Sequence, residues 1–239
     1  MPKDKTVKAA MLLGVGLGFF QQASGSEAAV YYTPDVLQDH GWDQAMVMKG
    51  NIGVGVFKLA GEVVAFFLLD RIGRRPLFLA SSTLVTMCLV MVGTAFALDW
   101  ATSLVLFWLC MFMFTFSLGL GPVTFVVASE IFPVTIRGKA MSIVIFVNRL
   151  MSGIIASSFE TLETWISKPH AFFFFGFLSF ISIGFYWYKV PETRGKTLEE
   201  IIANLGSTSP LRSSAVSTGD RASGGRHAPL QSSSDDEQE

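Results

Sequence analysis

The most prominent shortage in this 239-residue sequence is of charge. Asp, Glu, Lys and Arg together make up only 15% of the residues, whereas 51% are hydrophobic and the mean hydropathy is +0.48. A soluble domain of this size needs more charged side chains to cover its surface. The composition therefore excludes an ordinary soluble domain and indicates an integral membrane protein.

Residue types that carry metal or redox chemistry are also scarce. The two cysteines, Cys88 and Cys110, both fall in apolar runs, which favours packed thiols over a disulfide or a metal site. The three histidines are scattered over predicted loops and the carboxy-terminal tail. The sequence contains no nucleotide-binding loop, catalytic triad or zinc-ligand spacing. We therefore predict that the protein is not an enzyme and takes no cofactor.

The net charge of −1 does not indicate a nucleic-acid partner, because the basic residues stand in short clusters rather than over one face. At the amino end, the polar stretch MPKDKTVK leads into an apolar segment that is longer than the core of a signal peptide. No cleavage pattern follows it. We therefore expect no signal peptide.

Six apolar stretches are long enough to be transmembrane helices. A window of about 19 residues places them at approximately 7–37, 45–69, 76–98, 102–128, 140–159 and 171–188. The predicted fold is therefore all-α, a polytopic transmembrane bundle of six spans.

Basic residues mark alternate loops of this predicted bundle. They cluster before the first span, after the second, after the fourth and after the sixth. The other loops carry mainly acidic residues together with Trp42, Trp100 and Trp165. The positive-inside rule places the basic loops and both termini in the cytoplasm, with an aromatic belt at the opposite interface. The plasma, vacuolar and plastid membranes all remain open as locations.

The composition changes after Glu200 to Ser, Gly and charged residues. We predict a transmembrane domain at 1–204 and a disordered cytoplasmic tail at 205–239. The serines of the tail are candidate phosphorylation sites, and a solvated tail without a role is the simpler alternative.

Polar residues interrupt the first predicted span. The stretch QQASGSEAAVYYTP, at 21–34, places two amides, a carboxylate and two phenols at membrane depth. Polar groups at that depth need partners from neighbouring helices or a water-filled cavity. We interpret the segment as a broken helix whose polar middle faces a solute pathway.

Three of the predicted cytoplasmic segments combine both signs of charge: DRIGRRP at 70–76, SEIFPVTIRGKA at 129–140 and PETRGKTLEE at 191–200. Isolated exposed ion pairs contribute only about 0 to 1 kcal/mol each. We therefore expect a shared network that breaks and re-forms as helices tilt and so biases a gate. Charges that only set the topology are the alternative. The candidate network residues are Asp70, Arg74, Arg75, Glu130, Arg137, Glu192 and Arg194.

These four motifs, in this order and spacing, resemble the carboxy-terminal half of the sugar porter family of the major facilitator superfamily, over nearly all of 7–202. The run GVFKL at 55–59 is similar to the plastidic and vacuolar glucose transporter-like branch. The resemblance implies half of a twelve-span fold, in which two pseudo-symmetric halves hold the substrate near the bilayer midplane.

The function implied by this resemblance is transport of a monosaccharide, either a hexose or a related polyol, by alternating access. The implied partners are the sugar, the lipid bilayer and an amino-terminal half that this sequence does not contain. Protons are a further partner if the protein is a symporter rather than a facilitator. The alternative is a non-transporting sugar sensor or an inactive fragment.

The resemblance also implies substrate-binding residues, namely Gln21, Gln22, Glu27, Tyr31, Tyr32, Phe125 and Asn148. The glutamine amides match ligands of sugar hydroxyls, since an amide both donates and accepts hydrogen bonds. The two tyrosines match an aromatic pair that closes the site toward the outside.

Several of these positions depart from the family pattern. Glu27 stands where the family usually has an Asn, and Arg149 stands where a Trp is common. In GLGPVTF, at 119–125, Phe125 replaces the usual Trp of a bending segment, and Thr124 replaces a second Pro. A Phe still offers an apolar ring face to a sugar but lacks the indole N–H.

Four charged residues are expected near the middle of the membrane. A rise of about 1.5 Å per residue from the basic clusters places Lys58, Glu62 and Arg149 about 12 to 18 Å deep, and Glu27 is the fourth. We expect Lys58 to pair with Glu62 and Glu27 with Arg149, because an unpaired charge there costs about 3 kcal/mol. The simplest interpretation is a structural charge network. A Glu27 that couples protons to transport, or one that changes the substrate, is the alternative.

Overall fold

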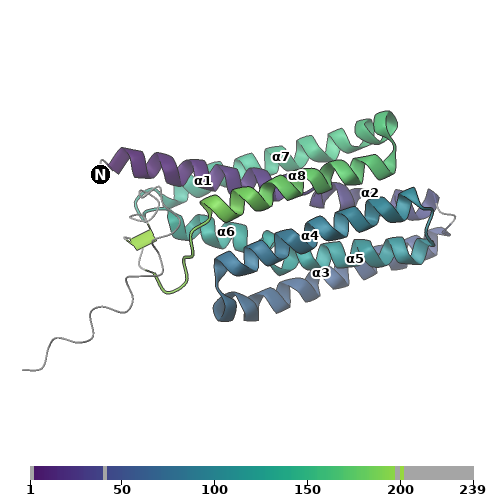
Figure 1. The fold of residues 1–239 in the computed structure, drawn as a ribbon, viewed down its shortest axis with the longest axis horizontal. Coiled ribbons are helices and arrows are strands. Elements are labelled where there is room, and N and C mark those ends of the chain that lie inside the picture. The colour runs from purple at the N-terminus through teal and green to yellow at the C-terminus, as the bar shows by residue number, and fades with distance from the viewer. Residues whose placement is uncertain (1–2, 40–41, 197–199, 202–239) are drawn as a thin grey trace, which may run out of the picture. The chain divides into compact units, whose positions relative to one another are not determined.

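The computed structural model describes residues 3–39, 42–196 and 200–201. Over these residues the regular secondary structure is all helix, with no strand. The helices are α1 (Lys3–Ala23), α2 (Ser26–Asp39), α3 (Gln44–Ile72), α4 (Arg74–Ala97), α5 (Thr102–Leu118), α6 (Leu120–Ile131), α7 (Arg137–Ile166) and α8 (Lys168–Lys189). They lie roughly along the long axis of Figure 1. The predicted tail at 205–239 lies outside the described residues, so the predicted domain boundary stays a prediction.

Five helical stretches are long and apolar enough to cross a membrane. They are Gln44–Ile72, Arg74–Ala97, Thr102–Ile131, Arg137–Phe159 and Pro169–Lys189. The first predicted span, 7–37, is divided between α1 and α2, and its apolar helix Val7–Ala23 is shorter than the other five. The prediction of an all-α bundle of transmembrane helices is confirmed, with a discontinuous first span.

Gly25 forms the break between α1 and α2. Its φ of +74° lies in the left-handed region, and its N–H donates to the carbonyl of Gln22 at 2.9 Å. A Cβ at this position would lie 2.9 Å from the ring of Phe175. Both the backbone conformation and the packing therefore require glycine here. The break ends α1 within a turn of Gln21 and Gln22, which leaves their amides at a helix terminus.

A second break, at Gly119, divides the fourth predicted span into α5 and α6. A Cβ at Gly119 would lie 2.4 Å from Ser81 Cβ and 2.8 Å from the carbonyl oxygen of Leu77, so the break packs directly against α4. The hydroxyl of Ser81 donates to the carbonyl of Thr115 at 2.7 Å and accepts from the N–H of Leu120 at 2.9 Å. One α4 side chain thus bridges the two sides of the break.

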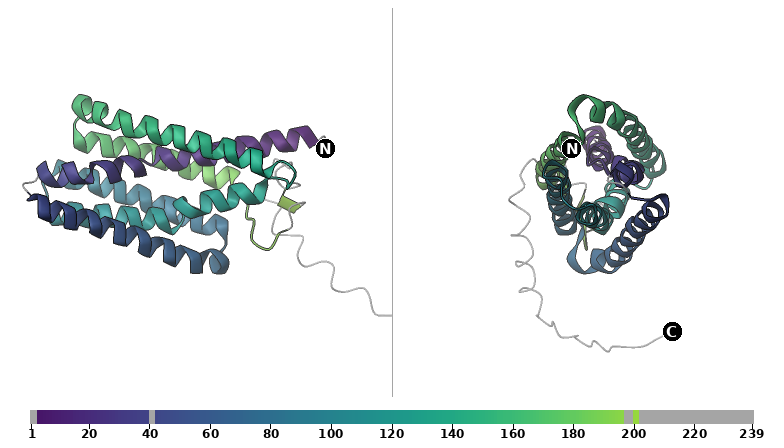
Figure 2. Two further views of the ribbon diagram at one scale, coloured as in Figure 1. Left: turned by 180° about the vertical axis from the view of Figure 1, so that it is seen from behind. Right: turned by 90° about the vertical axis from the view of Figure 1, so that its right-hand side faces the viewer.

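The apolar core includes the contact between α4 and α8. The ring of Phe78 meets the ring of Tyr186 edge-on at 4.4 Å between centroids, and Phe96 stacks on Phe172 at 5.4 Å. Such aromatic pairs add about 0.5 to 1.5 kcal/mol beyond the burial of their area. The right-hand view of Figure 2 shows the bundle turned so that many of the helices are seen end-on. These contacts pack α8 against α4, the helix that also contacts the break at Gly119.

Helices α3 and α7 are covered least by the rest of the chain. In the 18-residue apolar stretch of each helix, only 17% of the residues of α3 and 22% of those of α7 are buried, against 50% for α4. Helix α2 packs against both α3 and α7, which do not contact each other in the described part of the chain. The apolar surfaces of α3 and α7 are therefore free to face lipid or another protein.

Candidate functional site

Three buried amide side chains meet between the end of α1 and the middle of α7. Gln21 and Gln22 are each 3% exposed, and Asn148 is fully buried. The Nδ2 of Asn148 donates to Gln21 Oε1 at 2.6 Å and to the carbonyl of Gly18 at 3.1 Å. The Nε2 of Gln22 donates to Asn148 Oδ1 at 3.2 Å. We call Gln21, Gln22 and Asn148 the amide cluster.

Gln21 also ties the amide cluster to α6. Its Nε2 donates to the carbonyls of Leu120 at 3.0 Å and Gly121 at 2.9 Å, both in the first turn after the Gly119 break. Because its Oε1 accepts from Asn148, both ends of the Gln21 amide are engaged. The residue that the sequence offers as a sugar ligand therefore also joins α1, α6 and α7.

Gln22 has one unused acceptor. Its Oε1 is buried and has no hydrogen-bond partner among the described residues. A buried acceptor without a partner costs roughly 1 to 3 kcal/mol, and such atoms in a folded protein call for a specific explanation. A hydroxyl group donated by a ligand would satisfy this oxygen.

Glu27 and Arg149 lie on the helices that adjoin the amide cluster. Glu27 is in the first turn of α2, where the helix dipole favours a carboxylate, and Arg149 directly follows Asn148. The two side chains form an ion pair with Oε1 3.6 Å from Nη1, and they are 25% and 61% exposed. This distance is longer than a typical charge-assisted hydrogen bond, which measures about 2.7 to 2.9 Å. Both groups can therefore still form hydrogen bonds with other partners.

The second expected pair is not formed. Lys58 and Glu62 are both exposed on α3, and no ion pair joins them in the described part of the chain. Neighbouring elements do not hold the two side chains together, because α3 is the least covered of the long helices. Spacing four residues apart permits such a pair but contributes only about 0.2 to 0.5 kcal/mol.

The predicted aromatic ligands take different positions. Tyr31 is 61% exposed on α2, and Phe125 is half-buried on α6. The hydroxyl of Thr124, beside Phe125, donates to the carbonyl of Leu120 in its own helix at 2.6 Å. The side chain of Tyr32 lies outside the described residues. The roles of these aromatic residues stay predictions.

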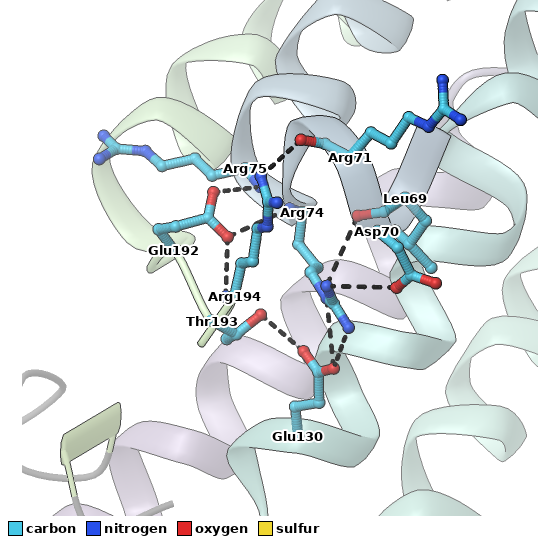
Figure 3. A network of polar contacts seen from close by, with 9 residues as sticks. All are labelled: Leu69, Asp70, Arg71, Arg74, Arg75, Glu130, Glu192, Thr193 and Arg194. Atoms are coloured by element: carbon cyan, nitrogen blue, oxygen red, sulfur yellow. Dashed lines mark hydrogen bonds and ion pairs between the residues drawn. The ribbon is translucent and has the colours of Figure 1, made fainter. Parts of the chain in front are cut away.

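The charged loops meet at one end of the bundle (Figure 3). The guanidinium of Arg74 donates to Glu130 Oε1 from Nη2 at 3.1 Å and from Nε at 3.3 Å, and it lies 3.8 Å from Asp70. The hydroxyl of Thr193 donates to Glu130 Oε2 at 2.6 Å. These bonds join the α3–α4 turn, the end of α6 and the segment after α8. We call the set the loop network: Asp70, Arg74, Arg75, Glu130, Glu192, Thr193 and Arg194.

Glu192 serves the loop network as a helix cap. Its carboxylate accepts the backbone N–H groups of Arg74 and Arg75, each at 3.1 Å, and that of Arg194 at 2.9 Å. The first two are orphan donors at the amino end of α4, where a negative charge is also favoured by the helix dipole. Gly73, with a φ of +100°, allows the approach, because a Cβ there would lie 3.0 Å from the carboxylate.

The remaining basic residues bind backbone carbonyls. Arg75 Nη2 donates to the carbonyl of Trp187 at 2.7 Å, with the guanidinium 5.8 Å from the ring centroid, and Arg194 donates to the carbonyl of Arg71. Arg137 donates to the carbonyl of Phe132 at 3.3 Å. No ion pair joins Arg137 to Glu130 within the described stretches, so Arg137 stands apart from the loop network.

Two residues of these arrangements were not anticipated from the sequence. Ser81 and Thr193 are short hydroxyl residues whose partners lie on other segments. For Ser81 the available signal is its position in an apolar span, where a polar side chain needs a partner. Residue type alone does not name that partner.

Membrane helices that break at buried hydrogen-bonding groups are typical of secondary transporters. The chain belongs to the family whose model is described as "Sugar (and other) transporter", which matches residues 2–205. It is an integral, multi-pass membrane protein of a transporter class rather than an enzyme. The predicted resemblance to sugar porters is confirmed, and the finer assignment to one branch stays a prediction.

Curated relatives match most of this chain but less than half of their own length. Polyol transporter 5 of Arabidopsis thaliana is 36% identical over 204 residues, covering 82% of this chain and 38% of the relative. D-xylose-proton symporter-like 2 of the same plant is 33% identical over 196 residues, covering 81% and 39%.

Solved structures also match most of this chain but less than half of their own length. The inward-open xylose transporter XylE from E. coli matches with a TM-score of 0.73 and 30% identity, covering 82% of this chain and 42% of XylE. The structure of the proton:xylose symporter XylE bound to 6-bromo-6-deoxy-D-glucose matches with a TM-score of 0.75 and 31% identity. The chain thus spans about two fifths of the length of these relatives.

Proposed function

We propose that this chain is the carboxy-terminal, six-span half of a transporter for an uncharged sugar or polyol. The observation that carries the proposal is the buried, unpaired Oε1 of Gln22 at the break between α1 and α2. A buried neutral amide oxygen suits an O–H donor on a neutral ligand, because a charged ligand would lose more hydration. The names of the relatives, which refer to polyols and xylose, agree with this chemistry.

Transport by alternating access requires a second half. The chain corresponds to about two fifths of its relatives, and α3 and α7 leave broad surfaces uncovered. Lys58, Glu62 and Arg149 are exposed on these two helices. Since a charge in lipid costs about 3 kcal/mol, we infer that a second six-helix half covers the side formed by α3, α2 and α7.

The loop network is the proposed cytoplasmic gate. Its basic residues lie on the side that the positive-inside rule assigns to the cytoplasm, together with both termini. Arg74 and Glu130 are only 17% and 27% exposed, so their bond is shielded from water and connects α4 with α6. Breaking and re-forming this bond as the halves tilt gives two discrete states.

Uptake by reconstituted protein tests the proposal. The chain is co-expressed with the amino-terminal half of Polyol transporter 5, placed in proteoliposomes, and supplied with radiolabelled sorbitol or D-xylose. We expect uptake by the pair that is lost with Gln22→Leu and retained with Gln44→Leu, which changes the same residue type at an exposed position. Equal uptake with and without the Gln22 amide would refute the assigned site.

A further inference from the structure

Ser81 differs from three other hydroxyl residues of α4, whereas a fourth, Thr86, contacts both its own helix and the Ser179 hydroxyl of α8. Ser82, Thr83 and Thr94 each donate to a carbonyl of their own helix three or four residues earlier. Such local bonds only satisfy the hydroxyl. Ser81 instead donates to Thr115 on α5 and accepts from the N–H of Leu120 on α6. It is fully buried.

The second of these bonds has a structural reason. Because α6 begins at Leu120 after the Gly119 break, the Leu120 N–H is one of the orphan donors of a helix start. No side-chain cap is made by Gly119 itself. Ser81 therefore supplies the cap from another helix and holds the first turn of α6 in place against α4.

That first turn of α6 continues into the candidate site. The carbonyls of Leu120 and Gly121 hold the Nε2 of Gln21, and the Oε1 of Gln21 accepts from Asn148. Asn148 Oδ1 in turn accepts from Gln22 Nε2, the amide whose Oε1 is unpaired. An unbroken series of contacts therefore leads from Ser81 on α4 through α6, α1 and α7 to the open acceptor.

We propose that Ser81 is a positioning residue, which orients the Gln22 acceptor for substrate by capping α6 and so fixing Gln21 and Asn148. Only the last step, that Gln22 takes a substrate hydroxyl, rests on the proposed function. Hydrogen-bonded side chains in a low-dielectric interior are strongly coupled, so removing one link is expected to move the others.

Side-chain resonances test the positioning without any substrate. The chain is labelled with ¹⁵N-glutamine in detergent micelles, and the side-chain amide resonances of Gln21 and Gln22 are assigned by substitution. We expect Ser81→Ala to shift both resonances while those of Gln38 and Gln44 stay in place. The matched control is Ser82→Ala, a neighbouring buried serine with a local bond, which should shift neither.

Two outcomes overturn the positioning role: no shift of the Gln21 and Gln22 resonances, or an equal shift of all glutamine resonances. If Ser81→Ala does not yield folded protein, Ser81→Cys is held to the same criterion, because it keeps a side chain of similar size and a weak thiol donor. A smaller shift in the same direction is then expected.

A double-mutant cycle tests the link to binding, with sorbitol affinity measured on the chain co-expressed with the amino-terminal half of Polyol transporter 5. Ser81→Ala alone should weaken sorbitol binding about fivefold, the effect of one lost neutral hydrogen bond. In a Gln21→Leu background it should have no further effect, because the series of contacts is already cut. The same fivefold loss in both backgrounds would overturn the proposal. Absence of any sorbitol binding by the pair with an unmodified chain would count against the proposed function, and the resonances would still decide the role of Ser81.

Discussion

Arg74 and Glu130 are joined by two hydrogen bonds, which run from Nη2 at 3.1 Å and from Nε at 3.3 Å to the same carboxylate oxygen. The residues are 56 positions apart and lie on different helices. This bond and the Glu192 cap hold the three charged loops together at one end of the bundle.

Glu130→Gln is expected to destabilise the chain. The substitution leaves the partly buried Arg74 guanidinium with only the exposed Asp70, 3.8 Å away, as a charged partner, and we expect the free energy of unfolding to fall by about 1 to 3 kcal/mol. Thermal unfolding in detergent measures the loss of stability. A thiol-reactive dye can report unfolding, because Cys88 and Cys110 are free and buried in the folded protein. Asp43→Asn is the control, since exposed Asp43 makes no side-chain cap bond. Equal losses for both variants would contradict the account.

Glu192→Ala is expected to expose the start of α4. The backbone N–H groups of Arg74 and Arg75 lose their acceptor, so their hydrogen exchange should become faster, whereas that of Val85 in the same helix should not change. Hydrogen exchange followed by mass spectrometry measures this. Unchanged hydrogen exchange at Arg74 and Arg75 would contradict the role of Glu192 as a helix cap.

Gly119→Ala is expected to disrupt packing at the second break. The new methyl would lie 2.4 Å from Ser81 Cβ and 2.8 Å from a backbone oxygen. We therefore expect the free energy of unfolding to fall by about 3 kcal/mol. Gly184→Ala is the matched control, because nothing lies within 4 Å of its Cβ position, and it should be neutral or stabilising by up to about 1 kcal/mol. Similar thermal unfolding of both variants would be inconsistent with a tight contact at Gly119.

The Glu27–Arg149 pair can be tested for its role by reversing it. If the pair is structural, Glu27→Arg and Arg149→Glu should each lower the thermal unfolding temperature, and the double variant should recover most of the loss. If Glu27 instead carries protons, Glu27→Gln should abolish proton-driven accumulation of D-xylose and leave exchange of D-xylose across the membrane intact. Unchanged accumulation would remove the proton-carrying interpretation.

The sequence predicts the helical class and the broken first span well, because hydropathy and the polar residues at 21–34 are local signals. It also names the members of the amide cluster, through the family resemblance. It does not reveal that Gln21 is engaged by the carbonyls of Leu120 and Gly121. That bond depends on where a helix break frees backbone groups, which residue types do not show.

The same limit explains the other differences. Glu192 binds backbone N–H groups more than 100 residues away, so charge pairing did not predict its role as a cap. Lys58 and Glu62 follow the four-residue spacing rule, but the uncovered face of α3 does not hold them together. Spacing predicts which side chains can meet, and packing decides which do.

The most direct test of the account is equilibrium binding of sorbitol and D-xylose in detergent to the chain purified together with the co-expressed amino-terminal half of Polyol transporter 5, compared with the Gln22→Leu and Gln44→Leu variants of the chain. We predict saturable binding that Gln22→Leu weakens at least about tenfold. The substitution removes the unpaired acceptor and so leaves a substrate hydroxyl without a hydrogen-bond partner. Gln44→Leu should bind like the unmodified chain. Binding of equal affinity in all three proteins would contradict the claim that the Gln22 amide receives the substrate.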